Sequence, residues 1–288
     1  MDMAAAAGDW WIREGRQTLR SLCPQPILNW RETRYYGKYG EVELHLLEFL
    51  CGADREALDV GANDGSYIHF MKKYARRVHA FEPIPWLSEE LSRKFQQDIR
   101  RNKVIIHNLA LSRSDGSTVL RMPIVDGVLV HGCSSISQAV AAKYSEFKEV
   151  PVRLKALDDI YDGDVGFVKI DVEGHEEAVL EGMRRTIQRC QPRMQVEAEE
   201  SIAPGAIVRI ARFFEELGYR GFFVFQRQVL PIARFDKDLM QNPANYPDLK
   251  AGLEQRQRFG RYVYNFIFLP AAEPADTLQK IQERVATL

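Results

Sequence analysis

The sequence predicts an α/β fold in which helices cover a mostly parallel sheet. Three observations support this prediction. Short apolar runs alternate with segments of helical periodicity, several of these runs end at glycine or acidic residues, and the 288-residue chain of 33.1 kDa is long enough for one large domain. Strand, helix, strand, helix and strand follow one another within about fifty residues, which is typical of right-handed crossovers between parallel strands.

The first half of the chain supplies three of the expected strands. They are the short apolar runs at residues 57–60, 78–81 and 104–106. The segments between them carry apolar residues at helical spacing, which predicts two helices. The first helix presents Ile68, Met71 and Ala75, and the second presents Leu87, Leu91, Phe95 and Ile99.

The second half resumes the same alternation. Strands are expected at 167–170, 194–196, 221–225 and 262–269, and helices at about 176–188 and 207–217. The run at 262–269 is rich in aromatic and β-branched residues, which are frequent in strands.

Two long segments interrupt this alternation. Residues 123–150 are rich in glycine and serine, and residues 226–261 are polar and contain proline. Connections of this length in a compact domain are usually lids or binding loops. We therefore expect one domain over residues 51–270 with these two irregular insertions as a lid, an N-terminal helical extension over 1–50, and a C-terminal helix over 271–288.

Composition and charge disfavour several classes of protein. Lys and Arg number 39 against 40 Asp and Glu, so the basic surplus of a general nucleic-acid binder is missing and no nucleic-acid partner is expected. No apolar run approaches the ~20 residues of a membrane span. The first residues do not resemble a signal peptide, and the four cysteines lack a C-x-x-C pair. These features predict a cytoplasmic protein.

A glycine loop follows the strand at 57–60. Gly61 and Gly65 allow a ligand to approach the backbone, and the next helix directs its free N–H groups toward that ligand. Asn63 replaces the second glycine of a dinucleotide-binding loop, which disfavours a pyrophosphate. Glu82 ends the next strand, where a carboxylate accepts both hydroxyls of a ribose. The two features predict a nucleoside ligand; the alternative is a tight turn and a surface glutamate.

A polar cluster follows the strand at 167–170. Asp171, Glu173, His175 and Glu176 come to the same edge of the sheet as Gly61, where they offer acid–base chemistry. Asp171 is the first candidate, and an imidazole such as His175 titrates near neutral pH. The alternatives are a packing role for His175 and a helix-dipole role for Glu176. No metal is expected, because one such cluster without further ligands is weak evidence.

Four motifs in order resemble the FkbM-type family of S-adenosylmethionine-dependent methyltransferases. They are Leu-Asp-Val-Gly-Ala-Asn-Asp-Gly at 58–65, Ala-Phe-Glu-Pro at 80–83, Leu-Asp-Asp-Ile at 157–160 and Lys-Ile-Asp-Val-Glu-Gly-His-Glu at 169–176. The last string is the most diagnostic, and the resemblance covers about residues 55–200. It implies a Rossmann-like class I methyltransferase fold, with a seven-stranded, mostly parallel sheet, an antiparallel last strand and helices on both faces.

The resemblance also implies a reaction and a set of cofactor contacts. The reaction is methyl transfer from S-adenosyl-L-methionine to a hydroxyl of a small molecule or glycan, such as a sugar or secondary metabolite. The domain over 51–270 becomes the methyltransferase domain, and its two insertions become an acceptor lid. By position, the cofactor contacts are Asp59, Gly61, Asn63 and Gly65 at the methionine part, Glu82 and Pro83 at the ribose, Asn108 and Ala110 at the adenine, and Asp171.

The resemblance leaves the catalytic base open among three residues. Asp171 and His175 are expected beside the transferred methyl, and Glu197 ends the fifth strand near the acceptor. Two other functions are weighed against methyl transfer: an NAD-dependent oxidoreductase, which Asn63 disfavours, and a non-catalytic methyltransferase-like scaffold, which the intact motifs disfavour. The sequence leaves a homo-oligomer open.

Overall fold

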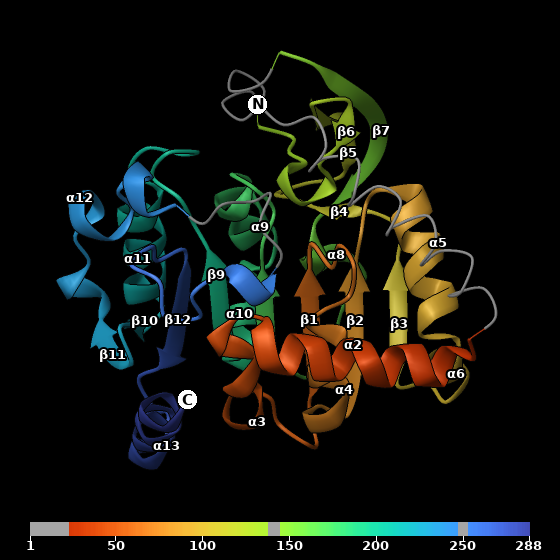
Figure 1. The fold of residues 1–288 in the computed structure, drawn as a ribbon. Helices are drawn as coiled ribbons and strands as arrows, with labels where there is room; N and C mark the ends of the chain where they lie inside the picture. Colours follow the sequence, from red (N-terminus) through yellow and green to blue (C-terminus); the bar gives the residue numbers. More distant parts are fainter. Residues whose placement is uncertain (1–22, 138–144, 247–252) are drawn as a thin grey trace.

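The computed structural model describes residues 23–137, 145–246 and 253–288 of the chain. Its main sheet has eight strands in the order β11-β10-β12-β9-β8-β1-β2-β3 (Figure 1). The parallel strands are β1 (Glu56–Val60), β2 (Arg77–Phe81), β3 (Val104–His107), β8 (Val165–Ile170) and β9 (Arg193–Glu197). Strand β12 (Asn265–Pro270) runs antiparallel between β9 and β10 (Tyr219–Phe225), as the predicted last strand should.

The predicted class of fold is confirmed, but the sheet has one strand more than the expected seven. The extra strand, β11 (Gln228–Pro231), forms a hairpin with β10. Gln226 and Arg227 form its two-residue turn, and both have positive φ, as in the turns that favour hairpins. Asn-Gly or Asp-Gly normally signals such a turn, so this part of the 226–261 segment was wrongly expected to be irregular.

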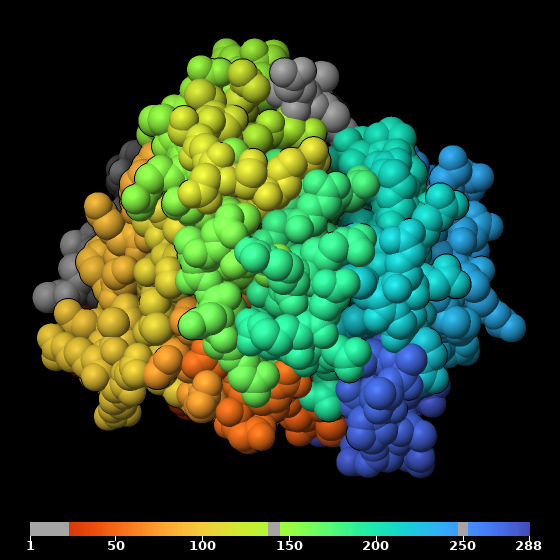
Figure 2. All heavy atoms as spheres, turned by 180° about the vertical axis from the view of Figure 1, so that it is seen from behind, coloured from red at the N-terminus to blue at the C-terminus, as the bar shows by residue number. Residues whose placement is uncertain are grey.

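Helices cover both faces of the main sheet (Figures 1 and 2). One face packs against the helices α3 (Leu47–Leu50), α4 (Ile68–Tyr74), α5 (Pro85–Lys94) and α13 (Ala275–Thr287). The other face packs against α8 (Leu157–Ile160), α9 (Glu176–Gly182), α10 (Arg184–Cys190) and α11 (Ala206–Glu216). Successive strand residues alternate between the two cores, with Leu58 and Val60 in one and Ala57 in the other.

A second, smaller sheet stands beyond the carboxyl ends of the main strands (Figure 1). Its strands are β4 (Ala110–Leu111), β5 (Gly116–Val125), β6 (Val128–Leu129) and β7 (Phe147–Lys155). The turn between β5 and β6 is Asp126-Gly127, with positive φ at both residues. The described ends of the 123–150 insertion are therefore strands, and the expectation of an irregular segment was wrong there.

Several expected elements differ at their ends. The expected helix at 176–188 is two helices that meet at Met183, and α5 is followed after Phe95 by α6 (Gln96–Arg100). The last strand begins at residue 265 rather than 262.

Helices and 3-10 turns form much of the remaining segments. In the N-terminal segment, the structure describes α2 (Gln25–Tyr39) and the 3-10 turn η1 (Val42–His45), while residues 1–22 lie outside the described chain. The 226–261 segment contains η3 (Ile232–Arg234), α12 (Lys237–Met240), η4 (Pro243–Asn245) and η5 (Leu253–Gln255). Within the described residues, no helix is both long and apolar enough to cross a membrane.

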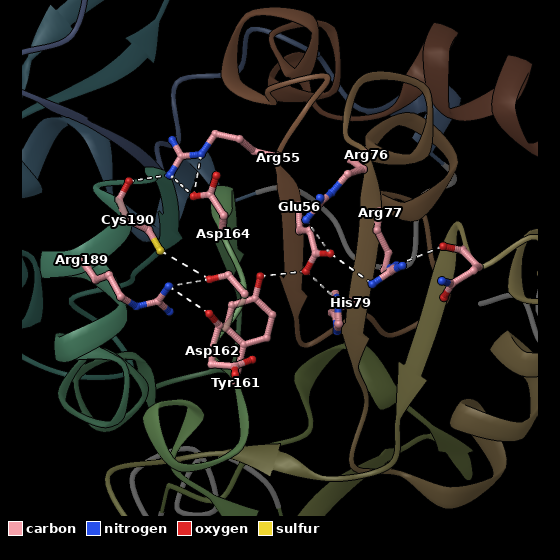
Figure 3. A network of polar contacts seen from close by, with 12 residues as sticks. Arg55, Glu56, Arg76, Arg77, His79, Tyr161, Asp162, Asp164, Arg189 and Cys190 are labelled. Carbon is pink, nitrogen blue, oxygen red and sulfur yellow. Dashed lines mark hydrogen bonds and ion pairs between the residues drawn. The ribbon is translucent and has the colours of Figure 1, made fainter.

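A polar network closes the amino edge of the sheet (Figure 3). Glu56, at the start of β1, is only 4% exposed, and its carboxylate lies 3.1 Å from Arg76 and 3.2 Å from Arg77. The same carboxylate accepts a 2.9 Å hydrogen bond from Tyr161 and lies 3.1 Å from His79. Because a buried carboxylate needs such partners, the network fixes β1, β2 and the segment before β8 to one another. Functional groups gather at the opposite edge.

Candidate active site

The carboxyl ends of β1, β2 and β8 open into one pocket. Eight of the residues expected at the site line it: Gly61, Asn63, Glu82, Pro83, Ala110, Asp171, Glu173 and His175. Apolar side chains from the third strand and the small sheet complete the wall: Leu109, Leu111, Leu120 and Ile136. Parallel sheets place ligands at this edge, so the position agrees with the sequence-based expectation.

Glu82 lies at the centre of this pocket's hydrogen bonding. Its side chain is nearly buried, and its carboxylate accepts the backbone N–H groups of Asn63 at 2.9 Å and Ile84 at 2.8 Å. Burial raises the pKa of Glu82 to about 7, although these two N–H groups act in the opposite direction. A carboxylate has about four acceptor sites. Glu82 therefore retains capacity for a pair of neighbouring hydroxyl groups in the pocket.

The packing of the protein itself also restricts the two glycines of the loop. At Gly61, which has φ +82°, a Cβ atom would lie 1.8 Å from the backbone oxygen of Asp171. At Gly65, also at φ +82°, it would lie 2.7 Å from Phe95 and 2.8 Å from Leu91. Close packing of the protein itself requires both glycines. Gly61 still lines the pocket, whereas Gly65 lies outside the pocket lining.

The two asparagines also hold the pocket together. The Asn63 side-chain oxygen lies 2.9 Å from Nδ1 of His131, which belongs to the turn η2 (His131–Cys133) and also lines the pocket. The Asn108 amide donates to the backbone oxygens of Glu82 and Pro83 at 3.0 Å each. Asn108 therefore fixes the end of β2, and its neighbours Leu109 and Ala110 form the wall instead.

A buried polar row crosses the sheet beside the pocket. Asp59, Lys169 and Gln195 occupy directly opposite positions on β1, β8 and β9, and each is at most 5% exposed. The Lys169 ammonium lies 2.9 Å from the Asp171 carboxylate, 3.3 Å from the Gly61 backbone oxygen and 3.9 Å from Asp59. Lys169 thus pairs with the carboxylate of Asp171.

Charge within this row is unevenly compensated. Burial raises the pKa of Asp59 to about 7, and its oxygens accept no hydrogen bond from the described residues. Burial opposes the charge of Lys169, but Asp171 and Asp59 outweigh it and raise the pKa of Lys169. Asp59 therefore faces Lys169 rather than the pocket lining. In the sequence, this row could be recognised only from the single polar residue within each of the apolar runs 57–60, 167–170 and 194–196.

Three carboxylates meet where β8 and β9 end. Oxygen atoms of Asp171, Glu173 and Glu197 lie within 4.8 Å of one another. Burial, followed by the negative charge of Asp171 and Glu41, raises the pKa of Glu197 well above its usual value. Like charges this close favour protonation of at least one member of the cluster. The oxygens of the cluster are also of the kind that bind divalent cations.

His175 lies apart from the acidic contact. Its Nε2 is 3.0 Å from the Ser112 hydroxyl, just beyond β4, and burial together with Arg113 lowers the pKa of His175. The carboxylate of Glu176 accepts the N–H of Gly174 at 2.9 Å, close to the start of α9. The structure therefore brings Asp171 and Glu197 together, leaves His175 on the Ser112 side of the pocket, and gives Glu176 a structural contact.

Comparison with known proteins identifies the family. The order of the main strands and the pocket at their carboxyl edge define a class I methyltransferase fold. The sequence model of the methyltransferase FkbM domain matches residues 59–220, more than half of the chain. The chain belongs to the FkbM methyltransferase family and is a methyltransferase. This confirms the resemblance drawn from the four motifs.

Similar solved structures share little sequence with the chain. The methyltransferase FkbM from Methylobacillus flagellatus KT is 16% identical, with a TM-score of 0.47 over 75% of this chain. The chain spans only 44% of that protein. The precorrin-6y C5,15-methyltransferase from Geobacter metallireducens GS-15 is 12% identical, with a TM-score of 0.40 over 80% of this chain and 87% of the other. The comparison with curated proteins gave no match.

Proposed function

We propose that the chain transfers a methyl group from S-adenosyl-L-methionine to a hydroxyl oxygen of a sugar, glycan or secondary metabolite. The observation that carries the proposal is Glu82, a nearly buried carboxylate that ends β2 and retains acceptor capacity within the pocket. S-adenosylmethionine supplies a methyl group already activated on a sulfonium. The tasks left to the protein are to hold the two substrates and to accept one proton.

The residues of the pocket suit an adenosyl ligand. Glu82 accepts the two ribose hydroxyls and disfavours a phosphate at that position by charge repulsion. Leu109, Ala110 and Leu111 offer an apolar wall for the adenine ring. Gly61 and Asn63 lie at the methionine end, where Asp171 provides negative charge opposite a sulfonium. Asp59, Gly65 and Asn108 act through the protein by supporting these groups.

Holding the acceptor oxygen and the methyl group in line contributes most to the rate, because alignment is worth effective molarities of about 10⁵–10⁸ M. A placed base adds about 10²–10⁴-fold when it removes the hydroxyl proton. We assign this proton to the Asp171–Glu197 contact, because Asp171 lines the pocket and an oxygen of its carboxylate lies within 4.8 Å of one of Glu197. His175 remains a second candidate base.

The two insertions fit the proposed acceptor lid. His131 and Ser134, within the 123–150 segment, already line the pocket. Limited proteolysis with and without S-adenosylhomocysteine tests this role. Protection of both segments is expected, and unchanged cleavage would count against the lid.

Turnover and binding are measured separately to test the function. Release of S-adenosylhomocysteine is followed with a panel of hydroxylated acceptors, and cofactor binding is followed by calorimetry. Asp171→Ala and Glu197→Gln are expected to reduce turnover by about 10²–10⁴-fold and to change cofactor affinity far less. The turnover of His175→Ala is expected to lie between that of these variants and that of the wild type.

The control is Asp276→Asn on the distant helix α13, which is expected to behave as wild type. A titration with NAD should give no heat. Normal turnover in Asp171→Ala, His175→Ala and Glu197→Gln would contradict the catalytic assignment. Absence of S-adenosylmethionine binding would contradict the proposed function itself.

A further inference from the structure

A second pocket lies beside the first, on the β10–β12 side of the sheet. Its wall includes Tyr39, Glu41, Glu43, Asn245, Tyr264 and Asn265. These residues come from the end of α2, the following turn, the η4 segment and the start of β12. All of the lining residues lie outside the 59–220 segment that matches the family. The second pocket is therefore built by the parts of the chain that the family motifs do not describe.

A continuous series of polar contacts connects the two pockets. The Tyr67 hydroxyl donates to Glu41 at 2.5 Å, and the Gln195 amide donates to Tyr67 at 2.6 Å and to Asn265 at 2.9 Å. The ammonium of Lys169 lies 4.9 Å from the centre of the Tyr67 ring and 2.9 Å from Asp171 of the first pocket. These contacts form one short series of polar side chains between the two pockets, which we call the wall. Asp171 lies at one end of the wall and Glu41 at the other.

Glu197 belongs to the same wall. Asn265 is the residue directly opposite it across β12 and β9, and the Asn265 amide donates to Glu41 at 3.1 Å. The charges of Asp171 and Glu41 both act on Glu197. A molecule in the second pocket that reaches this wall therefore lies near Glu197 and, through it, near Asp171 of the first pocket.

We propose that this second pocket is the acceptor site and that it takes a polyhydroxylated ring, such as a pyranose. This proposal rests on the proposed methyl transfer. The rings of Tyr39 and Tyr264 provide flat apolar faces, while Glu41 and the amides of Asn245 and Asn265 provide acceptors and donors for several hydroxyl groups. Flat faces combined with many directional polar groups suit a sugar ring better than an apolar ligand.

The lining of the second pocket is not dominated by negative charge. Glu43 is 6% exposed, and burial followed by the charge of Glu41 raises the pKa of Glu43 to about 8, so this side chain is mostly protonated at neutral pH. Arg256 and Arg258 also line the pocket, and Arg258 donates to the backbone oxygen of Gly37 at 2.7 Å and to that of Gly40 at 3.4 Å. The protonated Glu43 and the arginines therefore add donors for the oxygens of a polyhydroxylated ring.

The reaction at the wall balances as follows. The acceptor oxygen forms a bond to the methyl carbon while the methyl–sulfur bond breaks, and the sulfur leaves as a neutral thioether. The hydroxyl proton passes to the carboxylate of Asp171, beside Glu197. No oxidant or further reactant is needed.

Filling the second pocket tests its assignment. Asn245 lines the pocket, whereas its neighbour Ala244 is exposed and does not. Asn245→Trp is expected to block entry, and Ala244→Trp is the matched control. The probes are methyl hexosides for turnover and S-adenosylhomocysteine for calorimetry. Asn245→Trp should lose at least tenfold in kcat/KM for the hexosides and still bind S-adenosylhomocysteine normally, and Ala244→Trp should resemble the wild type.

The loss of one hydroxyl acceptor is measured with the same probes. Glu41→Gln should lower kcat/KM for the hexosides and leave S-adenosylhomocysteine binding unchanged. Unchanged turnover in Asn245→Trp, or no hexoside turnover by a protein that binds S-adenosylhomocysteine, would overturn the acceptor assignment. Failure to bind S-adenosylhomocysteine would instead contradict the proposed function, so the two failures are distinguishable.

Discussion

The two pockets differ in how the chain builds them. The first is formed by consecutive strand ends, and its central carboxylate, Glu82, is held by backbone N–H groups that lie 19 and 2 positions away in the sequence. The second is formed by segments far apart in the sequence, and Glu41 contacts Asn265 across 224 positions. Local motifs therefore encode the first pocket, whereas tertiary packing alone creates the second.

The wall between the pockets combines both kinds of construction. Asp171 belongs to the diagnostic motif, but Tyr67 and Gln195 join it to Glu41 through contacts that span much of the chain. A substitution on the motif side should thus disturb the fold, cofactor binding or the chemical step, while one on the far side should disturb acceptor use. The following changes test this division, from the largest expected effect to the smallest.

Gly61→Ala should have the largest effect. The new Cβ atom would lie 1.8 Å from a backbone oxygen that cannot move without shifting β8, so we expect a loss above about 4 kcal/mol or failure to fold. Gly127→Ala is the control, because Gly127 has a similar φ of +76° and open space around its Cβ position. It should cost only about 1–2 kcal/mol. Urea unfolding of both variants measures the difference, and equal losses would show that the close approach is unimportant.

Lys169→Met tests the wall itself. Removing the ammonium leaves Asp59 and Asp171 as neighbouring buried or half-buried acids, which should lower the free energy of unfolding by about 3–5 kcal/mol. Lys280→Met, which removes an exposed ion pair on α13, should cause no measurable change. Thermal unfolding distinguishes the two. A Lys169→Met protein as stable as the control would mean that these acids are already protonated.

Glu82→Gln tests the first pocket alone. The amide keeps one acceptor for the backbone N–H groups but loses the charge that accepts two hydroxyls. Hydrogen bonds to a charged group are worth about 1.5–3 kcal/mol, so S-adenosylhomocysteine affinity should fall roughly 10–100-fold. The relative use of different acceptors should not change. If affinity stayed the same while acceptor preference shifted, the assignment of the two pockets would have to be exchanged.

The pH dependence of cofactor affinity should show the smallest effect. Burial raises the pKa of Glu82 to about 7, so below this pH the free protein carries a proton that the ribose hydroxyls must displace. Affinity should therefore rise by up to about tenfold per pH unit below 7 and level off above it. The stability of the free protein depends on pH with the opposite sign. The folded state holds this proton more tightly than the unfolded state does, so the contribution of Glu82 to the free energy of unfolding falls as the pH rises from about 4.5 to 7.

Calorimetry between pH 5.5 and 8.5 measures this dependence, with Glu82→Gln as the control that should lack it. A flat profile in the wild type would indicate that Glu82 is ionised throughout.

Periodicity and strand-end residues made much of the fold predictable. Parallel strands buried on both faces are short apolar runs, and the helices between them repeat apolar residues every three to four positions. Breaks at Phe95 and Met183 escaped prediction because neither residue disfavours a helix strongly. The hairpin turn at Gln226-Arg227 escaped because neither residue is one that usually adopts positive φ.

The candidate site was predictable only in part. The position of Glu82 in the pocket follows from its place at the end of a strand, but Asp59 faces the opposite side of β1 from its neighbours Leu58 and Val60 and contacts Lys169 instead. The side-chain amide of Asn108 donates to a backbone oxygen at the end of β2. Tyr67 and Glu41 gave no local signal, because their importance comes from partners distant in the sequence.

The most direct test of the central claim is a crystal structure of the chain with S-adenosylhomocysteine. The claim predicts density in the first pocket, with both ribose hydroxyls within hydrogen-bond distance of the Glu82 carboxylate and the sulfur directed toward Asp171 and Glu197. A ligand bound elsewhere, or a ribose that leaves Glu82 without a contact, would contradict it.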